Sequence, residues 1–426
     1  MKNTLKFIIA LVLFSFSVQL LAQSGPVKVE VVEKDGQFSL LRGGKPYYVK
    51  GVGGNTFMDK MVEVGANSLR TWGPEGAQEI LDKAHKRGIT VTLGLWVGQE
   101  RQGFDYNDEW AVKGQLEYFR EVVTKYKDHP ALLMWGVGNE MDLFYSNLKV
   151  WDALGDIATM IKEVDPNHPI MTVTAGIDVA EIQLIKERAP DVDILGINVY
   201  GDIPRVPKFI DLFGWDGPYM VTEWGPTGTW EVFKTDWHAA VDETSTDKAQ
   251  TYLTRFENYI AADKDNCVGS YVFLWGSKQE TTSTWFSMFT PDGKETGAVQ
   301  VMQYCFTGQW PANRCPEIQS FTVDGKVGYD NIYLKGGQNY KAEVKASDLD
   351  NDQLTYVWQM YKEPEETGTG GDFEADPVEI EGFIEGDAGP SVTIKAPKAK
   401  GGYRLFIFIY DGHDHVATAN HPFYIK

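Results

Sequence analysis

Two glutamates each close a short apolar run, and together they could divide acid and nucleophile chemistry between them. Glu140 ends the run that starts at Trp135 and passes through Asn139, and Glu223 ends the run that starts at Val221. One buried carboxylate at a strand end is often a cap or an ion-pair partner. Hydrolysis of a glycosidic bond needs two, one protonated to assist the leaving oxygen and one ionised to attack the anomeric carbon. Their surroundings must therefore separate the two pKa values.

A fold that serves this chemistry must bring two distant strand ends together. Short runs rich in β-branched residues alternate with stretches of helical period, which is typical of repeated βα units and a parallel sheet. The number of runs favours closure into a (β/α)8 TIM barrel, since an open sheet normally has about five or six strands. The active face of such a barrel lies at the carboxyl ends of its strands. The predicted strands are 47–53, 68–72, 91–96, 132–137, 170–174, 194–200, 219–223 and 269–275.

The chain is predicted to contain a leader and two domains. Lys2 and Lys6 flank a start that runs into an apolar stretch, which is typical of a signal peptide over residues 1–22. Residues 23–310 are predicted to form the catalytic barrel with an N-terminal β-hairpin. Residues 311–426, with short alternating runs, are predicted to form an immunoglobulin-like β-sandwich. No cysteine follows the leader directly, so we expect a secreted or periplasmic monomer without a lipid anchor.

Charge and cysteine content limit the partners of this chain of 426 residues. Its net charge of -20 argues against nucleic acid and against a membrane after signal removal, because both need a basic face. A neutral polysaccharide or oligosaccharide is compatible with this charge. The three cysteines are too few for a disulfide scaffold, and pairing of Cys305 with Cys315 is favoured over unpaired thiols. Cys267 would then remain free.

No cofactor is expected, and the strand ends carry no His and Asp cluster of the kind that holds a catalytic metal. The acidic turn Asp348, Asp350 and Asp352 could hold calcium, but a solvated turn is the favoured interpretation. Three classes of function are compatible with a barrel. A hydrolase that uses two carboxylates is favoured over a non-catalytic carbohydrate-binding barrel and over a metal-dependent hydrolase.

The pair formed by Asn139-Glu140 on the fourth predicted strand and Glu223 on the seventh resembles the signature of clan A glycoside hydrolases. The resemblance covers the barrel, and the pairing of both motifs at these strands is more specific than either alone. It implies a retaining mechanism in which Glu140 is the acid/base and Glu223 is the nucleophile. It also implies that Asn139 binds the 2-hydroxyl of the sugar.

Other strand ends fit the same resemblance. Arg70 matches the arginine that hydrogen-bonds the nucleophile, Tyr200 matches the tyrosine that orients it, and Trp275 matches the aromatic floor under the reacting sugar. A structural ion pair and ordinary core aromatics are the alternatives for these three residues. Sugar rings pack their C–H faces on aromatic side chains. Further aromatic candidates for the substrate cleft are Trp72, Trp96, Trp224 and Trp230.

Within clan A, a barrel followed by an immunoglobulin-like domain looks most like glycoside hydrolase family 158, with family 2 and family 5 barrels as near relatives. This resemblance implies endo-acting cleavage of β-1,3-glucan (laminarin) by double displacement through a covalent glycosyl-enzyme. A β-mannanase, a β-galactosidase or another clan A β-glycosidase is the alternative. The sugar, the linkage and the choice between internal and terminal cleavage depend on loops that the motifs do not encode.

Overall fold

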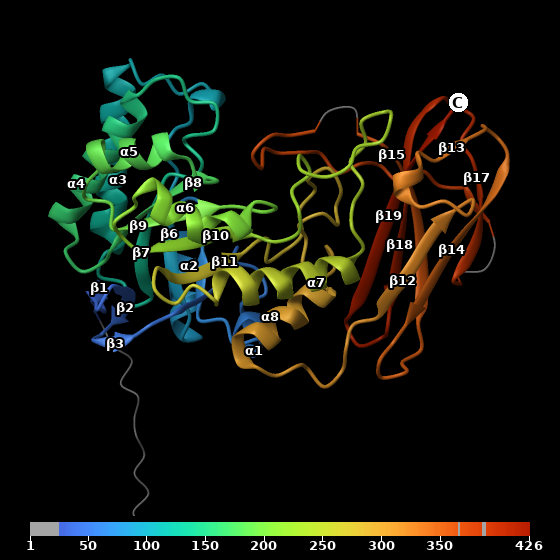
Figure 1. The fold of residues 1–426 in the computed structure, drawn as a ribbon, viewed down its shortest axis with the longest axis horizontal. Coiled ribbons are helices and arrows are strands. Elements are labelled where there is room, and N and C mark those ends of the chain that lie inside the picture. The colour runs from blue at the N-terminus through green and yellow to red at the C-terminus, as the bar shows by residue number, and fades with distance from the viewer. Residues whose placement is uncertain (1–24, 365–366, 386–388) are drawn as a thin grey trace, which may run out of the picture.

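The computed structural model describes residues 25–364, 367–385 and 389–426. A closed β/α barrel is followed by a sandwich of two β-sheets, and the two domains lie side by side (Figure 1). The predicted signal peptide, residues 1–22, lies outside the described residues. Within the described residues, no helix has both the length and the apolar character that a membrane span requires.

The eight predicted strands pair in parallel and close on themselves, which confirms the barrel. Nearly every strand position is buried, because helices cover the outside of the barrel and side chains fill its interior. In barrel order the strands are β4 (Val49–Gly53), β5 (Ser68–Arg70), β6 (Thr90–Leu95), β7 (Leu132–Val137), β8 (Ile170–Ala175), β9 (Ile194–Asn198), β10 (Tyr219–Trp224) and β11 (Cys267–Val272), which pairs back to β4.

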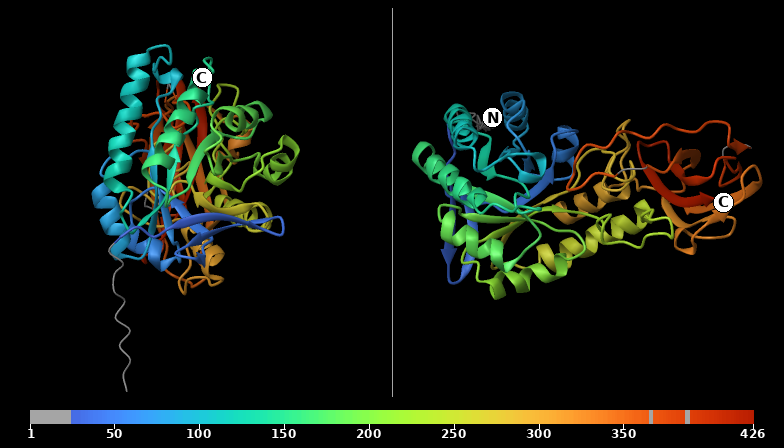
Figure 2. Two further views of the ribbon diagram at one scale, coloured as in Figure 1. Left: turned by 90° about the vertical axis from the view of Figure 1, so that its left-hand side faces the viewer. Right: turned by 90° about the horizontal axis from the view of Figure 1, so that it is seen from above.

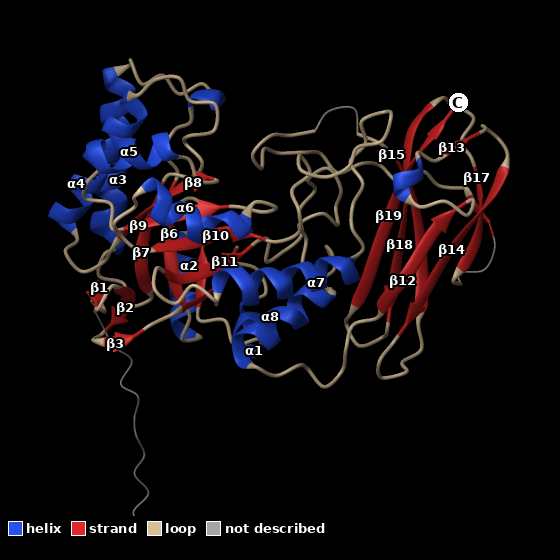
Figure 3. Ribbon diagram, viewed as in Figure 1, coloured by secondary structure: helices blue, strands red, loops and turns tan. Residues whose placement is uncertain are grey.

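Amphipathic helices connect the strands and cover the barrel (Figure 3). Side-chain caps fix several of their starts: Asp108, for example, accepts hydrogen bonds from the backbone N–H groups of Trp110 and Ala111. The helices are α1 (Met58–Glu63), α2 (Ala77–Lys86), α3 (Glu109–Tyr126), α4 (Lys149–Val164), α5 (Val179–Arg188), α6 (Val206–Phe213), α7 (Ser245–Arg255) and α8 (Gly297–Thr307), with short turns η1 (Glu100–Gln102), η2 (Ile203–Arg205) and η3 (Phe256–Ile260).

An antiparallel N-terminal sheet closes the amino-terminal end of the barrel. Val29 and Leu40 from this sheet pack in one buried cluster with Met134, Met171 and Met220 from the barrel strands. This end is therefore a packed core, and the opposite end is left for chemistry. The strands of the small sheet are β1 (Val29–Lys34), β2 (Gln37–Arg42) and β3 (Lys45–Pro46).

The C-terminal domain consists of two four-stranded sheets, which confirms the predicted sandwich. The sheet residues 339–347 and 391–395 alternate between buried and less buried positions, as expected when one face of a sheet packs on the other sheet, whereas residues 403–409 and 416–423 of the second sheet are buried throughout. One sheet has the order β12 (Glu317–Val323), β14 (Asn339–Ser347), β17 (Ser391–Lys395), β16 (Ile384–Glu385), and the other β13 (Tyr333–Leu334), β19 (Val416–Ile425), β18 (Gly401–Tyr410), β15 (Thr355–Lys362), with the turn η4 (Gly328–Asp330) between β12 and β13.

A buried polar network joins the two domains. Asp242, in the loop after β10, forms an ion pair with Lys248 at 2.7 Å and accepts a hydrogen bond from Asn420 Nδ2 at 2.8 Å. Arg404 Nη2 donates to the carbonyl oxygen of Ala240 at 2.8 Å. Buried polar groups are costly when they lack partners, so these bonds specify one docked arrangement.

The predicted pairing of Cys305 with Cys315 is wrong, because all three cysteines are free thiols. Cys315 is buried in the linker, where its Sγ lies 3.5 Å from the carbonyl oxygen of Glu295. Cys305 lies near the end of α8, and burial raises the pKa of its thiol to about 12. The linker instead carries Cys315 to the start of α8, where its backbone N–H donates to Gln300 Oε1 at 2.9 Å, whereas Cys305 lies near the end of that helix.

Candidate active site

Glu223 lies in β10 and receives hydrogen bonds from three side chains. Arg70 Nη1 donates to its Oε1 at 3.0 Å, and Trp72 Nε1 donates to the same oxygen at 2.7 Å. The hydroxyl of Tyr200 donates to Oε2 at 3.2 Å. Burial and the neighbouring Glu223 charge raise the pKa of the Tyr200 phenol far above its usual value, so the phenol keeps its proton and donates it. These donors favour an ionised Glu223 in a fixed orientation.

Arg70 also ties the nucleophile candidate to Asn139. Its Nη2 donates to Asn139 Oδ1 at 2.7 Å. Asn198, at the end of β9, donates from Nδ2 to the same Asn139 oxygen at 3.1 Å and to Glu140 Oε1 at 2.9 Å. The structure thus joins the predicted residues Arg70, Asn139, Glu140 and Glu223 in one hydrogen-bond network. The sequence analysis missed Asn198, although a polar residue that ends an apolar strand is a usable signal.

Glu140 follows β7 in a conformation that is costly for a residue with a side chain. Its φ of 51° lies in the left-handed region, and Gly138 before it has a φ of 75°. Any side chain at Gly138 would be strained at this φ, and its Cβ would also displace the Met141 side chain, whose Sδ would lie 2.5 Å away. This turn aims the Glu140 carboxyl group at the site. Burial and then the charge of Glu223 raise the pKa of Glu140 to about 8.

Further buried carboxyl groups make the surroundings of the pair acidic. Asp142 accepts from the backbone N–H of Ala175, and burial raises its pKa to about 7. Glu280 lies in the loop after β11, and burial, with the charge of Glu223 contributing, raises its pKa. Lys278 forms an ion pair with Glu280 at 2.9 Å. The charge of Lys278 is therefore already paired with that of Glu280.

An aromatic cluster surrounds Tyr200 beside Glu223. Phe273, just after β11, contacts the rings of Trp72 and Tyr200 edge-on, with centroids 5.9 Å and 6.2 Å away. Trp230 contacts Tyr200 with a centroid distance of 5.5 Å, and it is 58% exposed. The position of Trp230 fits the predicted contact with substrate. The backbone of Trp72 packs directly against Gly94, where a Cβ would stand 2.3 Å from the Trp72 carbonyl carbon.

The structure buries two of the predicted substrate contacts. Trp275 packs against Phe289 at a centroid distance of 5.0 Å, whereas Phe273 of the same strand end contacts Trp72 and Tyr200 beside Glu223. Trp224 is fully buried against Tyr252 on α7 and Phe256 in η3. Residues along a strand alternate between its two faces, so Trp224 points away from the site when Glu223 points into it.

Trp96 lies beside Trp72 at a cavity of about 290 Å³. The cavity follows β5 and β6 and is bounded on one side by α3, so it adjoins the indole that holds Glu223. Its size and aromatic lining are compatible with a sugar unit. The lining residues are Trp72, Gly73, Pro74, Glu75, Trp96, Tyr118 and Phe119.

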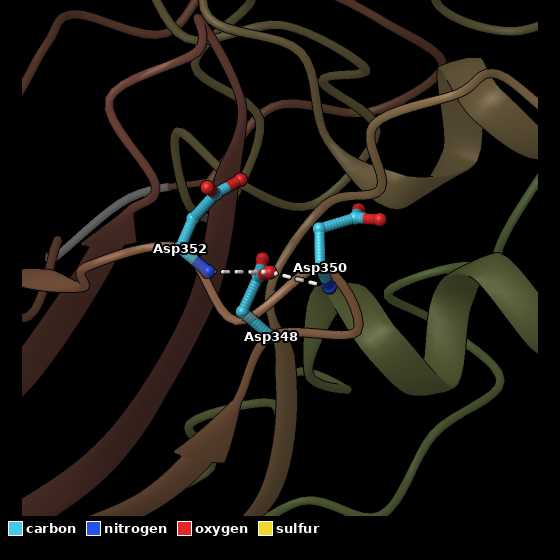
Figure 4. Close-up of side chains that lie close together, drawn as sticks. All are labelled: Asp348, Asp350 and Asp352. Carbon is cyan, nitrogen blue, oxygen red and sulfur yellow. Dashed lines mark hydrogen bonds between the residues drawn. The ribbon is translucent and has the colours of Figure 1, made fainter.

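The acidic turn of the sandwich brings three carboxylates together (Figure 4). One oxygen from each of Asp348, Asp350 and Asp352 lies within 4.8 Å of the others. Asp348 Oδ1 accepts from the backbone N–H groups of Asp350 and Asp352, and Asp350 Oδ2 accepts from the N–H of Arg314. These bonds are those of a hydrogen-bonded turn that also contacts the linker.

The fold and the site together define a TIM barrel with one carboxyl group after the fourth barrel strand and another on the seventh. Residues 58–204 match the family model for the TIM barrel domain of glycosyl hydrolases family 2. The matched segment includes Glu140 and ends before Glu223. It covers less than half of the chain.

Similar proteins with curated descriptions are β-glucuronidases. That of Chlorocebus aethiops is 28% identical over 220 residues, which cover 44% of this chain and 32% of the relative. That of Paenibacillus borealis is 24% identical over 224 residues, which cover 46% of this chain and 36% of the relative. The matched region thus spans about a third of the length of these relatives.

Solved structures of β-glucuronidases share the fold. The Bifidobacterium dentium enzyme, complexed with coumarin-3-O-glucuronide, has a TM-score of 0.53 and 20% identity, and the match covers 66% of this chain and 49% of that one. The Bacteroides uniformis enzyme has a TM-score of 0.51 and 14% identity, and the match covers 93% of this chain and 48% of that one. At these identities the likeness concerns the fold.

Proposed function

We propose that this protein is a retaining β-glycoside hydrolase in which Glu223 is the nucleophile and Glu140 is the acid/base. One observation carries the proposal: three donors converge on Glu223, whereas Glu140 is buried with a raised pKa. A retaining mechanism needs this division, because one carboxylate attacks while the other carboxylic acid protonates the leaving oxygen.

The proposed reaction follows from the network. Ionised Glu223 attacks the anomeric carbon while Glu140 gives its proton to the glycosidic oxygen, and a covalent glycosyl-enzyme forms. Glu140, now ionised, removes a proton from water, and this water attacks the anomeric carbon. The bond from that carbon to Glu223 breaks, and the sugar leaves with its β configuration retained. Asn139 Oδ1 accepts from Arg70 and Asn198, so its Nδ2 is the atom left to donate to a sugar hydroxyl.

For the substrate, we propose a neutral β-linked glycan. Among the described residues, Arg70 is paired with Glu223 and Lys278 with Glu280, so these two cations at the site are engaged by glutamates. A uronate carboxylate placed there would face the charges of these glutamates. The finer proposal of an endo-acting β-1,3-glucanase rests on the resemblance to family 158, which combines a barrel with an immunoglobulin-like domain.

A β-glucuronide is the second candidate substrate, because the similar proteins named above are β-glucuronidases. β-Mannans and β-galactosides belong in the same comparison, since their hydrolases share the clan. A screen on laminarin, β-1,4- and mixed-linkage glucans, mannan, aryl β-galactoside and aryl β-glucuronide, with product sizing, separates these candidates.

Early release of mixed oligosaccharides from laminarin supports the endo-β-1,3-glucanase proposal. Release of monosaccharide alone contradicts endo action, and activity on the β-glucuronide alone contradicts a neutral substrate. Glycan binding without hydrolysis of any substrate supports a non-catalytic barrel and contradicts the enzymatic proposal.

The roles of the two glutamates have an asymmetric kinetic test. Glu223→Ala removes the nucleophile, so every substrate should become nearly inert. Glu140→Ala removes leaving-group protonation, which an activated aryl leaving group hardly needs, so the first step should survive while deglycosylation slows. Added azide should restore turnover in Glu140→Ala and give a β-glycosyl azide. A β-azide product from Glu223→Ala instead would reverse the assignment.

We also propose that the protein is exported, because residues 1–22 have the pattern of a signal peptide. N-terminal sequencing of protein from a culture that expresses the full chain tests this. A mature start near Gln23 or Ser24 supports export, and an intact Met1 in the cell contradicts it.

A further inference from the structure

A segment of the sandwich domain reaches across to the active face of the barrel. Residues 367–374, here called the strap, lie between β15 and β16, and this part of the chain extends from the sandwich toward the barrel (Figures 1 and 2). It contacts the loop after β6 through residues 369, 370 and 372, and the loop after β11 through residues 371 and 374. These strands lie three places apart around the barrel, so the strap bridges two loops of its active face.

Arg101 in η1, after β6, anchors the strap to the barrel. Its Nη1 donates to both carboxylate oxygens of Asp372, at 2.9 and 3.0 Å, and to the carbonyl oxygen of Thr369 at 3.0 Å. The Arg101 side chain is only 9% exposed and that of Asp372 is 39% exposed, so the ion pair is shielded from water on the barrel side alone. Gly370 packs tightly here: a Cβ on it would stand 2.7 Å from Leu143, which follows Glu140.

Two residues after β11 anchor the strap from the opposite side. Lys278 Nζ donates to the carbonyl oxygen of Gly371 at 2.8 Å, and Glu374 accepts from the backbone N–H of Thr281 at 2.7 Å. Between these residues lies Glu280, whose pKa is raised by burial and by the charges of both Glu223 and Glu374. Glu280 therefore lies between the strap and the proposed nucleophile and senses the charges of both.

Phe373 lies between the two anchored residues of the strap and is 90% exposed. Both Asp372 and Glu374 are held by the barrel, so the exposure of Phe373 is fixed by contacts on either side of it. An aromatic ring held in water beside a glycosidase site offers a flat apolar face to the C–H face of a sugar. Packing on a sugar ring would explain why an aromatic side chain is held at this exposed position.

We propose that the sandwich domain forms part of the substrate cleft, with Phe373 as the aromatic platform for a sugar ring beyond the one at Glu223. This inference rests on the proposed glycosidase function. The strap also bounds the cleft where it bridges the two loops, and it makes the substrate chain contact both domains. Long substrates should depend on the strap, and a single glycosyl unit with a small leaving group should not.

The test compares Phe373→Ala with Val378→Ala, which removes another exposed apolar side chain from the same connection of the sandwich. Each is assayed with a hexasaccharide of the hydrolysed glycan (laminarihexaose if laminarin is cleaved) and with the dinitrophenyl monoglycoside of the same sugar. Phe373→Ala should raise the hexasaccharide KM about tenfold, as expected when one aromatic face no longer packs on a sugar. Its monoglycoside kcat/KM should stay within about twofold, as should both values for Val378→Ala.

Arg101→Ala, which releases the strap from the loop after β6, should also raise the hexasaccharide KM, with Arg120→Ala on α3 as its surface control. Unchanged hexasaccharide kinetics in Phe373→Ala overturn the inference while the glycosidase proposal stands. An equal loss on both substrates in Phe373→Ala also overturns it, because the strap would then only support the catalytic residues. A wild-type protein that hydrolyses neither substrate overturns the proposed function itself.

Discussion

Replacing Trp72 by Phe should lower kcat/KM, because the indole N–H binds and orients a carboxylate oxygen of Glu223, the proposed nucleophile. Glu223 has three donors, and Trp72 supplies the shortest of these bonds, at 2.7 Å. A hydrogen bond to a charged group contributes about 2 kcal/mol, and the loss of that stabilisation from the transition state corresponds to about a 30-fold lower kcat/KM.

The Phe ring keeps most of the contact with Phe273, so the variant isolates the hydrogen bond from the packing. The assay is kcat/KM on an aryl β-glycoside, with the melting temperature as a check on folding. Trp215→Phe is the matched control, because it also removes one indole hydrogen bond, to the carbonyl oxygen of Pro218, before β10 and away from the active face. A fall between tenfold and hundredfold is expected in Trp72→Phe. A value within threefold of both wild type and Trp215→Phe would refute the reasoning.

Three further predictions concern pH and domain structure. The kcat/KM of the wild type should fall above about pH 8, because burial and the charge of Glu223 raise the pKa of Glu140 to about 8 and only its protonated form is an acid. Glu140→Ala on an activated aryl glycoside should lack this limb, and its persistence would contradict the assignment. Burial lowers the pKa of His421 to about 4 in the folded chain. As pH falls from about 6.5 to about 4, His421 therefore binds a proton in the unfolded chain before it does so in the folded chain. Stability should then fall by about 3 kcal/mol over that window; urea unfolding of His421→Gln should lack this contribution, and an unchanged pH dependence would count against it. A chain that ends at Trp310 loses the buried hydrogen bonds of Asn420 and should melt about 5 °C lower or more; an unchanged melting temperature and activity would mean that the sandwich is an independent appendage.

The barrel could be predicted from sequence because its local patterns and its topology agree. Each predicted strand is a short buried run. Parallel strands that helices cover are buried on both faces, so their sequences are apolar along almost their whole length. Strand ends then locate the active face without further information. This is why Glu140 and Glu223, far apart in the chain, could be expected at one site, and why Arg70 could be expected beside them.

Side-chain direction was harder to predict at the strand ends. Trp224 could have been excluded, because it neighbours Glu223 on the same strand and must face the helices. Trp275 could not, because β11 ends at Val272 and the chain leaves the regular alternation before Phe273 and Trp275. There the choice of which ring enters the site depends on contacts with Tyr200 and Phe289, and sequence spacing does not record these contacts.

The docking of the sandwich lies beyond sequence patterns altogether. Asp242 and Asn420 are 178 positions apart, and neither stands in a motif. Arg101 and Asp372 are likewise ordinary charged residues in their own segments, 271 positions apart. Their partnership exists only after both domains have folded, so the strap that bridges two barrel loops could be found only in three dimensions.

The central claim is that Glu223 attacks the sugar, and covalent trapping tests it most directly. A 2-deoxy-2-fluoro β-glycoside of the hydrolysed sugar, with a dinitrophenyl leaving group, should inactivate the wild type by forming a glycosyl-enzyme that hydrolyses slowly. Mass spectrometry of the protease digest should then place one fluoroglycosyl group on Glu223, and Glu223→Ala should remain unlabelled. Labelling of Glu140 or Glu280 instead, or an α-configured first product without any labelling, would contradict the account.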